Sequence, residues 1–112
     1  MKLFWVLLAI VGFFTAIISA HPANAVTAAY DQAKKELSVT VAHSVQNPAN
    51  HYISTIEVYV DGVKMISQDL KSQFNGTDQL AVYTLIDVKK GSKIKITTVC
   101  NKGGNKNTEI TI

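Results

Sequence analysis

The stretch YISTIEVYVDGVKMISQDL, residues 52–70, decides the fold class. Apolar side chains occupy every second position from Ile56 to Val60, and this period of two predicts a half-buried β-strand. The strand runs into Asp61-Gly62, a pair suited to the positive φ angles of a tight turn. The residues that follow therefore form the return strand of a predicted β-hairpin.

The same strand-and-turn pattern continues on both sides of this hairpin. Residues 28–37 are interpreted as a strand and a turn rather than a helix, because no convincing helical period is present. Further strands are predicted at residues 34–43, 80–88, 93–100 and 108–112. Several short strands separated by turns at about ten-residue spacing predict an all-β, antiparallel β-sandwich of about seven strands.

The chain begins with an apolar run that has the pattern of a secretory signal peptide, predicted over residues 1–20. A transmembrane anchor is the alternative, since the run is about long enough to span a bilayer. Small residues follow directly and no basic cluster does, which favours cleavage. We therefore expect an exported domain, periplasmic or extracellular, with no stable membrane span after cleavage.

The position of cleavage decides whether a histidine is kept. Cleavage as late as Ala25 leaves a domain of residues 26–112 and removes His21. Cleavage after Ala20 instead makes His21 the first residue, with a free α-amine beside its imidazole. The sequence leaves both sites open.

Composition narrows the classes of partner. All eleven basic residues are lysines spread along the chain, whereas nucleic-acid recognition depends heavily on arginine; we expect no nucleic-acid partner. Cys100 is the single cysteine, so no disulfide forms within one chain. Its thiol is a buried inert group, an intermolecular partner or a metal ligand.

Three residues with metal-binding side chains lie at the ends of predicted strands. His43 ends one strand, His51 begins the next after a short loop, and Cys100 ends a later one. Strand ends on one side of a sandwich cluster in space, and imidazole with thiolate suits zinc, iron or copper. The plainer interpretation is a pair of solvated loop histidines and a small buried cysteine.

The motif HYISTIEVYVDG, residues 51–62, followed much later by VCNKGG, residues 99–104, resembles the iron-binding domain of the desulfoferrodoxin and superoxide reductase family. The resemblance extends from about Val39 to Ile112. It implies an immunoglobulin-like β-sandwich that holds one non-haem iron through four histidine nitrogens and one axial cysteine sulfur. It also implies superoxide as the small-molecule oxidant, reduced to peroxide with electrons from an external donor.

The resemblance assigns roles to individual residues. His51 matches the histidine of the family's His-Tyr-Ile stretch, and Cys100 matches the axial cysteine, the residue expected to act in catalysis. His43 corresponds to the preceding histidine, and His21 to the early histidine if cleavage follows Ala20. Gly103 stands where the family has its last histidine.

Three functions remain open at this level. The first is an exported iron-binding redox domain similar to superoxide reductase, with reduced or altered activity. The second is a metal-free binding or structural sandwich of the cell envelope that has lost the site. The third is a copper carrier that uses an N-terminal His21. The sequence does not specify the oligomeric state.

Overall fold

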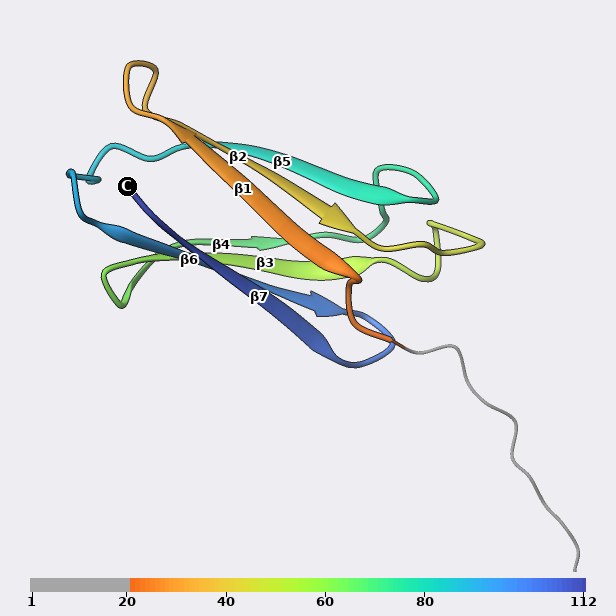
Figure 1. Cartoon of the computed structure of the whole chain (residues 1–112). Helices are drawn as coiled ribbons and strands as arrows, with labels where there is room; N and C mark the ends of the chain where they lie inside the picture. Colours follow the sequence, from red (N-terminus) through yellow and green to blue (C-terminus); the bar gives the residue numbers. More distant parts are fainter. Residues whose placement is uncertain (1–20) are drawn as a thin grey trace, which may run out of the picture.

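The computed structural model describes residues 21–112 and contains seven β-strands (Figure 1). The predicted signal peptide, residues 1–20, lies outside the described residues. Among residues 21–112 no helix is long and apolar enough to cross a lipid bilayer. The strands are β1 (Ala25–Asp31), β2 (Glu36–Ala42), β3 (Ile53–Val60), β4 (Val63–Asp69), β5 (Asp78–Thr84), β6 (Lys93–Cys100) and β7 (Asn105–Thr111).

The strands form two antiparallel sheets that pack face to face, which confirms the predicted β-sandwich. One sheet has the order β1-β2-β5 and the other the order β4-β3-β6-β7. The chain passes from one sheet to the other in the connections β2–β3, β4–β5 and β5–β6, as in the immunoglobulin-like arrangement. In Figure 1 the ends of β2 and β6 and the start of β3 lie at the same end of the sandwich.

The core lies between the sheets and follows the predicted alternation. Leu37, Val39 and Val41 of β2 point inward and are almost fully buried. In β6 the inward row is Ile94, Ile96, Thr98 and Cys100, with the residues between them more exposed. The hydroxyl of Thr98 donates to the carbonyl of Lys106 at 2.8 Å, so this buried polar group is satisfied.

The hairpin that decides the fold forms as predicted, with a register shift between Val58 and Tyr59 in the pairing of β3 with β4. Asp61 and Gly62 both have positive φ, +49° and +85°. At the other end of β3 the pairing with β6 shifts register between Ile53 and Thr55, and both Ile53 and Ile56 are buried. This bulge lies two residues after His51 and changes the direction in which the chain enters the strand.

Several strand boundaries differ from the sequence prediction, most clearly those of β5 and β7. β5 begins at Asp78 and ends at Thr84, so residues 85–88 lie in the following loop, where Leu85 packs into the core. β7 begins at Asn105, inside the segment predicted as a turn. In both cases pairing with a neighbouring strand, rather than local hydrophobicity, sets where the strand begins.

Candidate metal centre

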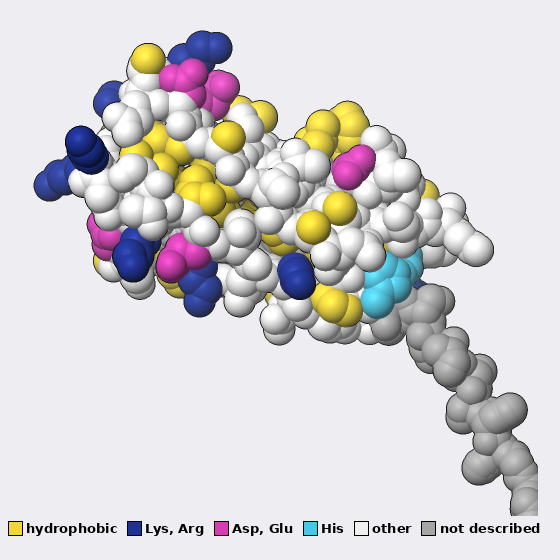
Figure 2. Space-filling model, viewed as in Figure 1, with side chains coloured by type: hydrophobic (Ala, Val, Ile, Leu, Met, Phe, Trp, Pro, Cys, Tyr) yellow, Lys and Arg dark blue, Asp and Glu magenta, His cyan; other side chains and the backbone are white. Residues whose placement is uncertain are grey.

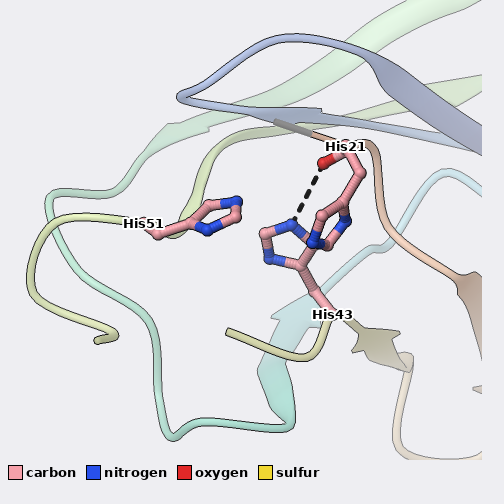
Figure 3. Close-up of side chains that lie close together, drawn as sticks. All are labelled: His21, His43 and His51. Atoms are coloured by element: carbon pink, nitrogen blue, oxygen red, sulfur yellow. Dashed lines mark hydrogen bonds between the residues drawn. The ribbon is translucent and has the colours of Figure 1, made fainter. Parts of the chain in front are cut away.

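Three histidines from separate segments meet at the end of the sandwich where β2 ends and β3 begins (Figures 2 and 3). Their ligand nitrogens all lie within 4.8 Å of one another. The ring centres of His21 and His43 are 4.8 Å apart, and each of these two rings is 5.0 Å from that of His51. We call His21, His43 and His51 the histidine cluster.

His43 continues the buried row of β2. Inward positions in this strand fall at every second residue, so the side chain two positions after Val41 also enters the interior. The imidazole of His43 is fully buried, which rules out the interpretation of His43 as a solvated loop histidine. A buried polar ring needs hydrogen-bond partners, and its surroundings supply them.

Gln73 fixes the tautomer of His43. Its amide nitrogen donates to two carbonyl oxygens, those of His43 at 2.7 Å and Asn75 at 2.9 Å, so its oxygen can only accept. The Nδ1–H of His43 therefore donates to Gln73 Oε1 at 2.7 Å. In the neutral ring this leaves the lone pair on Nε2, within the histidine cluster, so in this tautomer Nε2 does not donate to the carbonyl oxygen of His21, 3.3 Å away.

Gln73 is thus a positioning residue of the type found behind metal-binding histidines. We expect Gln73→Met, which keeps the size but removes both polar atoms, to lower metal affinity about 10–100-fold. ¹⁵N NMR of the His43 ring should show loss of the single Nδ1–H tautomer, a change that a merely structural role would not produce. An unchanged tautomer with unchanged affinity would show that Gln73 only fills space.

His51 is held by its own loop and by the end of β6. Its backbone N–H donates to the carbonyl of Asn47 at 3.0 Å, which closes a turn. The next residue, Tyr52, exchanges two hydrogen bonds with Asn101: Tyr52 N–H donates to Asn101 Oδ1, and Asn101 N–H donates to Tyr52 O, both at 2.9 Å. Asn101 Nδ2 also donates to Asn50 O at 3.0 Å. Asn101 therefore fastens the loop that carries His51 to the strand that ends at Cys100.

The imidazole of His51 has an unfilled bonding position. Its Nε2 is buried and has no hydrogen-bond partner among the described residues. Burial lowers the pKa of His51, and the neighbouring His43, His21 and Lys102 lower it further. Both effects favour the neutral ring, which is the form that binds metals. A buried, unpartnered nitrogen beside two other imidazoles fits a site for a metal ion.

His21 joins the histidine cluster from the segment that precedes β1. Its Nδ1 lies 2.9 Å from the carbonyl oxygen of Pro22, and its own carbonyl faces His43. A surface cleft of about 430 Å³ borders the cluster and is lined by His21, His51 and Lys102, among others. The cluster is therefore reached from solvent on the side that carries a lysine.

Cys100 lies at the same end of the sandwich but is not a member of the histidine cluster. It is buried on the inward face of β6, where its backbone pairs with Ile53. Its sulfur accepts a hydrogen bond from the N–H of Lys102 at 3.4 Å. The structure thus brings together the three predicted histidines, and the role of Cys100 as a ligand stays a prediction.

The positioning residues Gln73 and Asn101 were not identified from the sequence. Gln73 lies in a stretch interpreted only as a turn, and nothing local distinguishes it from other polar turn residues. Asn101 belongs to the VCNKGG motif, and its place directly after Cys100 is the one sequence signal from which it could have been identified.

Comparison with known proteins adds one finding. The fold is similar to that of a superoxide reductase (neelaredoxin) from Ignicoccus hospitalis, with a TM-score of 0.52 and 20% sequence identity over 81% of this chain and 80% of the other. No protein-family model matches the chain, and no curated protein matches it in sequence. At this identity the similarity establishes a shared β-sandwich fold.

Proposed function

We propose that this chain is an exported, metal-binding redox domain that holds one iron ion through His21, His43 and His51 and reduces superoxide. The observation that carries the proposal is the buried, unpartnered Nε2 of His51 inside a cluster of three imidazoles. The fold similarity to a superoxide reductase and the resemblance of the HYI and VCN motifs support the choice of reaction.

The roles of the residues follow from their positions. An iron ion bound by the histidines would supply the one-electron reduction of superoxide to peroxide. Lys102 borders the cleft beside His21 and His51 and provides a positive charge that attracts an anion. Gln73 keeps the Nε2 lone pair of His43 directed into the cluster. Cys100 is proposed as a further ligand, because its strand ends beside the Tyr52–Asn101 hydrogen bonds that position His51.

A copper site is the second candidate, and one observation favours it. The atoms that converge are all nitrogens, and the sulfur of Cys100 is not among them. Imidazole ligands alone suit copper at least as well as iron, and copper(II) lies at the top of the affinity order for such ligands. In that case the domain carries copper through the same three histidines.

Metal analysis of the purified exported protein, beside Cys100→Ser, separates these functions. We expect about one iron per chain, superoxide reduction, and a visible sulfur-to-iron absorption band in the oxidised protein that Cys100→Ser abolishes. About one copper per chain, unaffected by Cys100→Ser, would favour the carrier. Negligible metal in both proteins would contradict both candidates and leave a metal-free sandwich.

A further inference from the structure

The segment before β1 is built into the folded domain. Ala23 is 4% exposed and belongs to the hydrophobic core. The backbone N–H of Asn24 donates to the carbonyl of Ala42 at 2.7 Å, which extends the pairing of β1 with β2 beyond its first residue. Removing this segment would expose core surface and leave the carbonyl of Ala42 without this donor.

Pro22 also packs closely against the turn between β6 and β7. A Cβ added at Gly104 would lie 2.9 Å from Pro22 Cδ, closer than real Cβ atoms approach their neighbours, and 3.0 Å from Pro22 N. A Cβ at Gly103, in the same turn, would meet nothing within 4 Å. Gly104 therefore makes room for the segment that carries His21.

These contacts distinguish the two cleavage positions that the sequence leaves open. Cleavage after Ala25 would remove a core residue, a ladder hydrogen bond and one of the three clustered imidazoles. We propose instead that the chain is cut between Ala20 and His21, and that the new α-amine of His21 becomes an additional metal ligand. The role of the amine as a ligand rests on the proposed metal-binding function, whereas the position of cleavage does not.

The chemistry of this step is a peptide hydrolysis by a signal peptidase. Water adds across the bond, so that Ala20 receives the carboxylate and His21 the amine. The amine and Nδ1 of an N-terminal histidine then close a six-membered chelate ring on one metal ion. In the uncut chain Nδ1 lies 2.9 Å from the carbonyl oxygen of Pro22, a contact that chelation gives up.

The residue after His21 limits the binding mode. Proline has no backbone N–H, so Pro22 cannot supply a deprotonated amide nitrogen as a ligand. The nitrogens that remain are the amine and the imidazoles of His21, His43 and His51. This four-nitrogen donor set suits copper(II) geometry and also accepts iron.

The intact mass of the full 112-residue chain after export, purified from the cell envelope, tests the processing step. The expected mass corresponds to a chain that begins with His21. A mass that begins at Val26, or that of the uncut chain, would overturn this step and with it the amine ligand. The result does not depend on whether any metal binds.

Selective acetylation of the same exported protein tests the amine as a ligand. The α-amine loses its proton at lower pH than lysine side chains, so acetylation near neutral pH modifies it first and leaves all three imidazoles intact. We expect copper(II) affinity to fall at least about tenfold, since one nitrogen ligand of a chelate is lost. Equal affinity before and after acetylation, or no copper binding by either form, would overturn the amine ligand. If neither form binds copper, a mass that corresponds to a chain beginning with His21 would still support cleavage before His21.

Discussion

Replacing His51 with alanine should lower the affinity for the bound metal at least about 100-fold, more than the loss of an outer hydrogen-bond partner such as Gln73. The Nε2 of His51 is the one buried side-chain nitrogen or oxygen in residues 21–112 without a hydrogen-bond partner, which fits the proposed role of His51 as a metal ligand. The measurement is titration of the metal-free protein with iron(II) and, separately, with copper(II).

The control for this substitution lies in the same loop. Ala49→Ser changes an exposed side chain two residues from His51 and should leave metal affinity unchanged. Metal binding should also stabilise the fold, by roughly 2.7 kcal/mol when the free metal is 100 times its dissociation constant. The corresponding increase in melting temperature should appear in the Ala49→Ser protein. At the same metal concentration the stabilisation in His51→Ala should fall to about 0.4 kcal/mol or less, because a 100-fold weaker affinity leaves the site no more than half occupied. Equal increases in both variants would contradict the assignment of His51 as a ligand.

The largest loss of stability is expected at the centre of the core. Ile96 is fully buried in β6 and faces the opposite sheet, so Ile96→Ala should lower the free energy of unfolding by about 2–5 kcal/mol. In a domain of this size each 1 kcal/mol shifts the melting temperature by roughly 4–8 °C. Denaturant unfolding of the metal-free protein measures the loss without a contribution from ligand binding.

Val99→Ala is the matched control in the same strand. Val99 is 39% exposed and points away from the inter-sheet core, so its truncation should cost far less than that of Ile96. Comparable losses for the two variants would mean that β6 does not present alternate residues to the core. The assignment of Cys100 to the inward face of β6 would then be wrong.

The sequence predicted the sandwich because alternation is a local property of each strand. Leu37, Val39 and Val41 repeat with period two whatever they later pack against, and the residue two positions on, His43, inherits their inward direction. The two-residue spacing also explains why a histidine next to a loop is fully buried. This part of the site could therefore be inferred from the pattern together with the resemblance to the superoxide reductase family.

The rest of the site depends on contacts between segments distant in the chain. Gln73 reaches His43 across 30 residues, and Asn101 reaches Tyr52 across 49. No local pattern encodes such pairs, because many polar turn residues have the same chain neighbours and different partners. The packing of Ala23 in the core could not be predicted from the sequence pattern either. The small residues around Ala23 are as typical of a signal-peptide cleavage site as of a packed segment.

The most direct test of the proposed metal centre is a crystal structure of the purified protein with metal added, with the ion located by anomalous scattering. We expect one strong peak among His21, His43 and His51, at about 2.0–2.1 Å from a nitrogen of each ring, the distance typical of imidazole bound to zinc. The same map would show whether the sulfur of Cys100 and the amine of His21 lie within bonding distance. A peak elsewhere, or no peak among the three rings, would contradict the assignment of the histidine cluster as a metal site.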